Sequence, residues 1–177
     1  APLRGAAFPN YAGIDVLAGA AQNRVGDPAP GAGNLVSGNT HIGVWISWSE
    51  TTGNQILGNM IGTDANGNRA IPNYHGILIS GGTANQVGGT SAGAGNLISG
   101  NEYLGIWLEH YTQPGNTILG NIVGANRSGT EAIPNYKGIL ITSASSTTVG
   151  GSAAGAGNLV SGNTDIGVKL ELTSTLN

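Results

Sequence analysis

Cysteine is absent from the 177 residues, and charged side chains are scarce. The lack of cysteine excludes a disulfide framework and Cys-ligated zinc, and it leaves the cellular compartment open. Only 8% of the residues are charged, and the formal net charge is −3. Nucleic acids and anionic membrane surfaces attract clustered Lys and Arg, so we expect neither as a partner. No run of about 18 apolar residues occurs, so we expect no membrane insertion.

A helical pattern is also missing. No stretch combines apolar spacings of three, four and seven residues with capping residues, so we expect almost no helix. The 32 glycines do not recur at every third position, which excludes collagen. The chain is rich in Val, Ile and Leu, which excludes a disordered tail. It starts at Ala1 without Met or a signal peptide, as expected of a mature product or an excised piece of a longer chain.

One nonapeptide occurs three times. GAGNLVSGN begins at Gly31, GAGNLISGN begins at Gly93, and GAGNLVSGN begins again at Gly155, so the copies are 62 residues apart. A second motif, an Asn or Thr two residues before Val or Ile, begins every 31 residues at Asn23, Asn54, Asn85, Asn116 and Thr147. The repeating unit is therefore about 31 residues long, and loops of alternating length double the true period to 62.

Each unit contains three short apolar segments, which are rich in β-branched residues and bounded by Gly, Asn or Pro. This pattern predicts strands. Three strands per unit, stacked at a fixed period, predict an all-β solenoid of three-sided coils in which each strand pairs in parallel with its counterpart one coil away. We expect five to six coils in one domain, residues 1–177, with repeat units of approximately 1–32, 33–94, 95–156 and 157–177.

Alternation within the segments predicts which side chains fill the interior. The first segments contribute the pairs Ile14/Val16, Val44/Ile46, Ile77/Ile79, Ile106/Leu108, Ile139/Ile141 and Val168/Leu170. The second and third contribute Val25, Ile56, Val87, Ile118 and Val149, and Val36, Ile61, Ile98, Val123 and Val160. We also expect an Asn ladder along the coils, formed by Asn34, Asn59, Asn96, Asn121 and Asn158. The facing of Leu35, Met60, Leu97, Ile122 and Leu159 stays open, because both neighbours are aliphatic.

The patterns GNxISGNxxxGIxL, GNxIxGNxIGT and AxxxxVGGTxxGAGN resemble the repeats of right-handed parallel β-helix proteins, which occur in large bacterial secreted and surface polypeptides. The resemblance covers roughly residues 9–172 and implies a right-handed parallel β-helix and a secreted or cell-surface location. The wider superfamily includes pectate-lyase-like and polygalacturonase-like enzymes, phage tailspikes and adhesin-like proteins. The fold alone therefore does not decide the function.

The resemblance implies that an enzyme of this superfamily would carry a cluster of Asp residues, or a calcium-binding acidic group with a basic partner. No such cluster is visible in the sequence. The weak candidates for catalysis are Glu102, Glu109, His110 and Glu171. Glu109 and Glu171 occupy equivalent positions two coils apart, roughly 10 Å by stacking geometry. Glycoside hydrolysis places its two carboxyl groups roughly 5 to 9.5 Å apart. Solvating charge at turns also explains these residues, so an enzyme is not the expectation.

The loop GTDANGNRAIPN carries the weak metal candidates Asp64, Asn66 and Asn68 at alternate positions. This resembles the first half of a calcium loop, but the terminal bidentate Glu is missing. The equivalent loop has Asn126, Ser128 and Thr130, and a turn-rich connection explains both. The three histidines fall at non-equivalent positions, which favours surface residues over a metal site. We expect no cofactor, with Ca²⁺ as the alternative.

An outward stripe is the most informative feature for function. In the first strand of each unit, one outward residue lies between the two inward residues. These outward residues are Asp15, Trp45, Leu78, Trp107, Leu140 and Lys169. The middle four, Trp45, Leu78, Trp107 and Leu140, form an apolar row, whereas water-facing strands normally carry polar residues. We expect this row to bind a protein partner, a second copy of the chain or a polysaccharide, unless a loop covers it. No capping helix is visible at the solenoid ends, so we expect either further flanking coils or end-to-end stacking of chains. The sequence therefore predicts a structural or adhesive repeat module, with a carbohydrate-binding module or a polysaccharide-acting enzyme as alternatives.

Overall fold

Three parallel sheets wind into a solenoid in the computed structural model, which describes residues 9–109, 115–144 and 146–171. Sheet A contains β1 (Ala12–Val16), β4 (Ile42–Ser47), β7 (His75–Ser80), β10 (Leu104–Leu108), β13 (Lys137–Thr142) and β16 (Ile166–Glu171). Sheet B contains β2 (Arg24–Val25), β5 (Gln55–Ile56), β8 (Gln86–Gly88), β11 (Thr117–Leu119) and β14 (Thr148–Val149). Sheet C contains β3 (Leu35–Val36), β6 (Met60–Ile61), β9 (Leu97–Ile98), β12 (Ile122–Val123) and β15 (Leu159–Val160).

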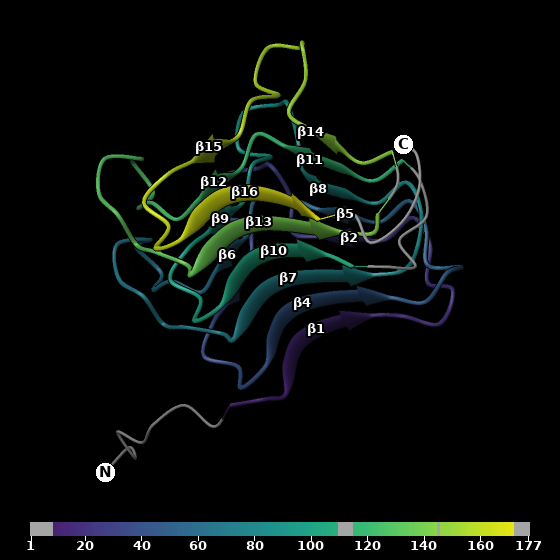
Figure 1. Ribbon diagram of the computed structural model, residues 1–177, viewed down its shortest axis with the longest axis horizontal. Coiled ribbons are helices and arrows are strands. Elements are labelled where there is room, and N and C mark those ends of the chain that lie inside the picture. Colours follow the sequence, from purple (N-terminus) through teal and green to yellow (C-terminus); the bar gives the residue numbers. More distant parts are fainter. Residues whose placement is uncertain (1–8, 110–114, 145, 172–177) are drawn as a thin grey trace.

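One strand from each sheet forms a coil. Coil 1 contains β1 to β3, coil 5 contains β13 to β15, and β16 begins a sixth coil. In Figure 1 the sheet A strands run from left to right across the front while the coils rise from β1 to β16, so the winding is right-handed. The predicted all-β, three-sided parallel solenoid with a unit of about 31 residues is confirmed. The described residues form no helix, and therefore none long and apolar enough to cross a bilayer.

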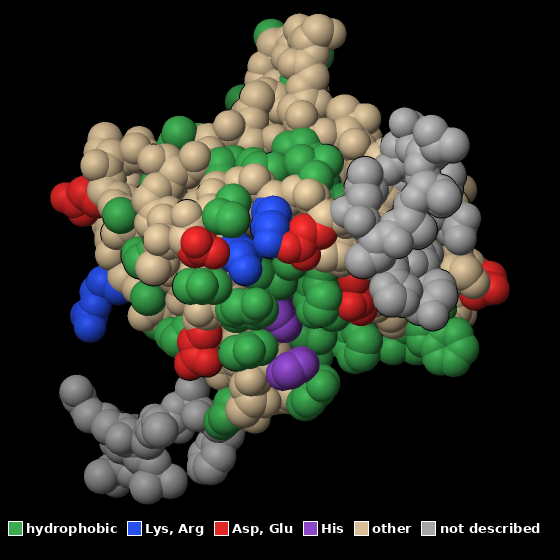
Figure 2. Space-filling view, viewed as in Figure 1, with side chains coloured by type: hydrophobic (Ala, Val, Ile, Leu, Met, Phe, Trp, Pro, Cys, Tyr) green, Lys and Arg blue, Asp and Glu red, His purple; other side chains and the backbone are tan. Residues whose placement is uncertain are grey.

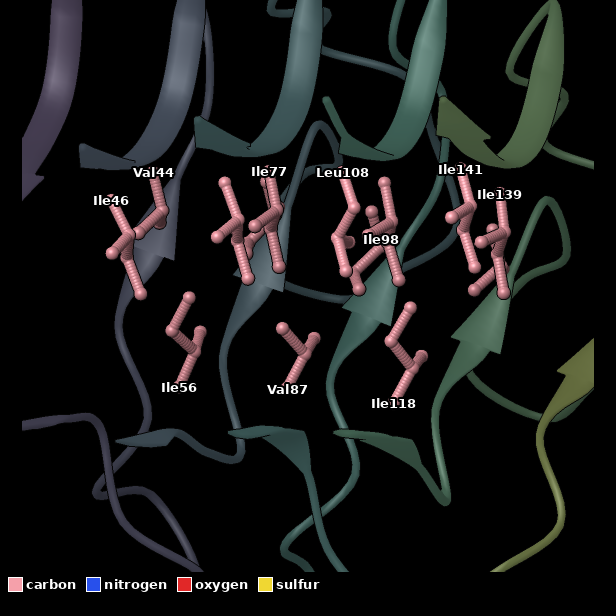
Figure 3. Close-up of a cluster of buried hydrophobic side chains, with 14 of the residues drawn as sticks. Val44, Ile46, Ile56, Ile77, Val87, Ile98, Leu108, Ile118, Ile139 and Ile141 are labelled. Atoms are coloured by element: carbon pink, nitrogen blue, oxygen red, sulfur yellow. The ribbon is translucent and has the colours of Figure 1, made fainter. Parts of the chain in front are cut away.

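The interior is a stack of aliphatic columns. Val44, Ile77, Ile106 and Ile139 form one column and are completely buried, and they meet Ile56 and Val87 from the opposite wall (Figure 3). These inward assignments are confirmed. The columns are open at the last coil, where Val168 is 40% exposed and Leu170 69% exposed, although both continue the inward pattern.

Three Asn ladders line the corners, where the sequence predicted one. The predicted ladder of Asn34, Asn59, Asn96, Asn121 and Asn158 is confirmed. The other ladders are Asn23, Asn54, Asn85 and Asn116, and Asn10, Asn39, Asn73, Asn101, Asn135 and Asn163. A typical member, Asn59, donates both its backbone N–H and its Nδ2 to Asn96 Oδ1, at 2.9 and 3.0 Å. The ladders therefore satisfy backbone groups that the corners would otherwise leave unpaired.

A glycine near the start of each sheet A strand interrupts the alternation of inward-facing and outward-facing side chains. A Cβ on Gly43 would lie 2.6 Å from the carbonyl oxygen of Gly76, and a Cβ on Gly76 would lie 2.5 Å from that of Gly105. Only glycine permits this approach. The strands curve at this point (Figure 1), so residues just before the glycine lie on the outer face of the sheet. Leu104 shows this, because it is buried but lies outside the interior cluster.

Sheet C carries a second outward row, which settles the facing that the sequence left open. The interior cluster takes the second residue of each strand, such as Ile61 and Ile98. The first residues, Leu35, Met60, Leu97, Ile122 and Leu159, lie outside that cluster. Leu97 is nevertheless buried, because the loop that contains Gly67 packs against it.

Candidate functional site on the outer face of sheet A

The predicted Trp-Leu row, formed by Trp45, Leu78, Trp107 and Leu140, lies in register on four adjacent strands of sheet A. Its exposure differs from the expectation. Leu78 and Leu140 are only 5% and 7% exposed, and the two tryptophans are half-buried. The row is therefore apolar and outward-facing, but it is not a uniformly exposed stripe.

Hydrogen bonds from the indoles explain this burial. Trp45 Nε1 donates to Ser80 Oγ at 2.8 Å, and Ser80 lies on the next strand, two residues beyond Leu78. Trp107 Nε1 donates in the same way to Thr142 Oγ1 at 3.1 Å, beyond Leu140. Each indole thus leans across its neighbour and covers the leucine there. The alternation of Trp and Leu predicted the row, but it could not predict this lean.

An aromatic ladder borders the row, and sequence reasoning missed it. Its members are Tyr11, His41, Tyr74, Tyr103 and Tyr136. Successive rings stack with centroids 4.9 to 5.6 Å apart and interplanar angles of 12° to 24°. Each member lies two residues before a sheet A glycine, so the signal was present at the same period as the glycines. Because the ring faces are occupied by stacking, the ladder offers mainly ring edges to solvent.

His75 fills the space between the ladder and the row. Its side chain is 4% exposed and lies 4.7 Å from the Tyr74 ring and 5.2 Å from the Trp107 ring, centroid to centroid. Burial lowers the pKa of His75 to about 4, and the nearby His41 contributes. Its Nδ1 has no hydrogen-bond partner. Figure 2 shows histidine among the hydrophobic side chains of this face, with a small group of charged side chains above them.

The row ends in a hollow at coils 1 to 3. The hollow has a volume of about 450 Å³ and is lined by Asp15, Leu17, Trp45, Ser47, Trp48, Ser49 and Ser80. Trp48 is 60% exposed and adopts a φ of +78°, a conformation that is an outlier for a bulky residue. Burial raises the pKa of the Asp15 carboxyl. We call this feature the Trp48 hollow. Trp48 was not singled out from the sequence, because it lies in a turn outside the strand pattern.

The structure separates the acidic candidates for catalysis. Glu102 precedes β10 and Glu109 follows it, so the two lie at opposite ends of one strand, roughly 20 Å apart. Glu171 pairs with Lys169, whose hydrogen bond lowers the pKa of the glutamate. Thr142 lies in register between the positions of Glu109 and Glu171. His110 lies outside the described residues.

The calcium candidates form a turn. Asp64 Oδ1 accepts hydrogen bonds from the backbone N–H groups of Asn68 and Arg69, at 2.9 and 3.2 Å, and the Asn68 bond lowers the pKa of Asp64. Asn126 Oδ1 in the equivalent loop accepts the same bonds from Thr130 and Glu131. Since the neutral amide of Asn126 accepts the same bonds in the equivalent loop, the role of Asp64 in closing the turn is enough to explain its presence. Asn66 is exposed, and no group of three His, Asp or Glu side chains suited to a metal occurs in the described part of the chain.

Comparisons of the chain with models of protein families, with curated proteins and with solved structures found no match. The chain is a three-sided parallel β-solenoid repeat protein by its own geometry. Its outer face of sheet A carries every tryptophan and tyrosine of the described residues: Tyr11, Trp45, Trp48, Tyr74, Tyr103, Trp107 and Tyr136.

Proposed function

We propose that this chain is a non-catalytic adhesive module that binds polysaccharide on the outer face of sheet A. The observation that carries the proposal is the gathering of the described aromatic residues on this one face, in a chain that is only 5% aromatic. An exposed aromatic and apolar patch marks an interaction site on a soluble fold. Indole rings stack on the C–H faces of sugars, and the tyrosine hydroxyls and Ser side chains nearby suit sugar hydroxyls.

The repeat motifs support a secreted or cell-surface location for this binding function. They resemble the repeats of bacterial secreted and surface polypeptides in the pectate-lyase-like superfamily, several members of which act on polysaccharides. We therefore place the module in a secreted or cell-surface protein of this superfamily. The separation of Glu102 from Glu109, and the pairing of Glu171 with Lys169, favour binding over polysaccharide cleavage.

Self-association through the solenoid ends is the competing function. Sheet A has six strands, whereas sheets B and C have five each. The edge strand β16 leaves Leu170 69% exposed, so a second copy of the chain is the competing partner at this end.

Retention by polysaccharides tests the proposal. Native electrophoresis through gels that contain neutral or acidic polysaccharides would compare the wild type with Trp45→Ala/Trp107→Ala. A matched control is Leu35→Ser, which alters an exposed leucine on the outer face of sheet C. We expect the double variant to lose affinity about tenfold or more, because about 1.4 kcal/mol of contact energy corresponds to a factor of ten. The control should be retained like the wild type.

Two outcomes would contradict the proposal. One is a wild type that no polysaccharide retains. The other is light scattering in which the wild type associates with itself and Trp45→Ala/Trp107→Ala is a monomer, which would support self-association through the same face. Circular dichroism of each variant confirms that the solenoid is folded.

A further inference from the structure

The Trp48 hollow lies where the two-coil repeat breaks. Coils 3 and 5 carry Leu78 and Leu140 in the outward row, but coil 1 carries Asp15 at that position. The residue two positions further on is Ser80 in coil 3 and Thr142 in coil 5, whereas coil 1 has Leu17. The chain therefore departs from its own repeat at two positions that line a single hollow.

The substitution of Asp for Leu creates the open space. On its other side Trp45 packs over Leu78, so a leucine at position 15 would cover the remaining flank of the indole. Asp15 is shorter and polar, and it leaves that flank facing the hollow. A carboxylate in a lining that includes Leu17, Trp45 and Trp48 loses hydration, and burial accordingly raises its pKa.

Trp48 provides an independent signal. The turn takes a positive φ in coils 1, 2, 3 and 5: the corresponding residues Ala18, Gly81 and Ser143 have φ of +57°, +125° and +53°, and Trp48 has +78°, a value that bulky residues avoid. The indole is also 60% exposed, so little burial offsets the backbone strain. Strain and exposure that cost folding stability at one side chain indicate a role in binding.

We propose that the Trp48 hollow binds a neutral pyranose unit of a polysaccharide, an inference that rests on the proposed function. Trp45 and Trp48 cover the C–H faces of the sugar, and the Asp15 carboxylate accepts hydrogen bonds from its hydroxyls. The hydroxyls of Ser47, Ser49 and Ser80 lie in the same lining. The volume of about 450 Å³ falls within the range of small-molecule sites. Because the charged group in the lining is negative, the hollow disfavours uronic acids and other anionic sugars.

Trp48→Gly is the first test. Glycine adopts positive φ without strain, so this variant should keep or raise the melting temperature. Its affinity for neutral tetrasaccharides should fall about tenfold or more, as measured by isothermal titration calorimetry. The probes are cellotetraose, tetra-N-acetylchitotetraose and, as the acidic comparison, tetragalacturonate. A residue with a purely structural role would lose stability when replaced, which separates the two explanations.

Asp15→Leu is the second test, because it restores the residue that the repeat uses. The leucine should fill the hollow, keep or raise the melting temperature and reduce the affinity for neutral tetrasaccharides about tenfold or more. Leu35→Ser is the matched control, since it alters an exposed leucine on the outer face of sheet C, and its affinity should stay within about twofold of the wild type. Trp107→Leu removes the other indole of the row, two coils away, and should reduce the affinity less than Asp15→Leu does.

Several outcomes would overturn the hollow as the site. They are a wild type that binds no neutral tetrasaccharide, Trp48→Gly and Asp15→Leu variants that bind like the wild type, or tighter binding of tetragalacturonate than of the neutral probes. If the Trp107→Leu variant alone loses binding, the hollow is wrong while polysaccharide binding by sheet A stands. If intact polysaccharides also fail to retain the wild type, the proposed function fails as well.

Discussion

Aliphatic residues contribute different amounts to stability at different points of one interior column. Ile106 is completely buried between Ile77 and Ile139, whereas Val168 continues the same column at the last strand and is 40% exposed. The position along the axis, more than the hydrophobicity of the residue, decides how much apolar area is removed from water. Substitutions at the two positions should therefore differ sharply.

Ile106→Asp should destabilise the protein by about 4 kcal/mol or more, because the carboxyl group is buried without a partner. Val168→Asp is the matched control at the open end, and its cost should be about 1 kcal/mol or less, since water reaches the new side chain. Thermal unfolding of both variants measures the difference. Equal melting temperatures for the two variants would contradict the inward column.

His75 should make the stability of the protein depend on pH. Its folded pKa of about 4 lies below the ordinary value of 6.5, so the unfolded chain binds the proton more readily between these values. Stability from this group is fully present above pH 6.5 and is lost as the pH falls towards 4. The loss should amount to about 2–3 kcal/mol, allowing for some solvent screening.

His75→Leu tests this expectation, because Leu104 occupies the equivalent position in the next coil. Urea unfolding from pH 7 to pH 4 should show a smaller loss of stability in the variant than in the wild type. The variant also removes the unpartnered Nδ1, so it should be at least as stable at pH 7. Parallel pH profiles for the two proteins would show that the imidazole titrates normally.

At the scale of the element, each corner is held by an Asn that bonds in both directions along the axis. Asn96 Oδ1 accepts from the backbone N–H and Nδ2 of Asn59, and Asn96 Nδ2 donates to Asn121 Oδ1 and to the carbonyl oxygen of Ile56. The strands of sheets B and C are only two or three residues long. The ladders therefore supply much of the register that such short strands cannot hold alone.

Asn96→Ala should cost about 2–5 kcal/mol, because it leaves two buried donors of Asn59 without an acceptor, at about 1–3 kcal/mol each. Asn34→Ala is the control in the same ladder. Asn34 is exposed in coil 1, so water replaces its bonds and the cost should be about 1 kcal/mol. Urea unfolding measures both costs. A difference below about 0.5 kcal/mol would mean that the ladder adds little to stability.

The repeat in the sequence was sufficient to predict the elements and the interior, because stacking demands the same residue type once per coil. It was not sufficient for the outer face. The aromatic ladder lies before the glycine at which the inward–outward alternation is interrupted. A period-two pattern that starts at Ile14 or Val44 therefore does not include the ladder residues. The burial of Leu78 depends on the lean of Trp45, which a one-dimensional pattern does not contain. Trp48 lies in a turn, and its backbone conformation, which the sequence does not reveal, is what identifies it as a candidate binding residue.

At the scale of the molecule, the solenoid is staggered at its C-terminal side. The edge strand β16 leaves Leu170 69% exposed, and Val149 and Leu159 of coil 5 are also exposed. These side chains lie where further coils would cover them. Stability in such an array is approximately a sum of coil and interface terms, so added coils in the correct phase should stabilise the rod.

A second copy of residues 110–171, appended after Glu171, tests this additivity. Glu171 lies 62 residues after Glu109, so the extension continues the repeat in phase by two coils. We expect a higher melting temperature and a larger dependence of the unfolding free energy on urea, because more surface becomes buried. Appending residues 143–171 breaks the alternation of loop lengths and should give a smaller gain. Equal gains from both extensions would contradict the 62-residue phase.

The three indole N–H groups of Trp45, Trp48 and Trp107 test the central claim most directly, because each gives a separate nuclear magnetic resonance signal. Single substitutions assign the signals, and cellotetraose or tetra-N-acetylchitotetraose is then titrated into the labelled wild type. The account predicts the largest shift at Trp48, a smaller shift at Trp45 and an unchanged signal at Trp107. Three unchanged signals at millimolar sugar, or the largest shift at Trp107, would contradict it.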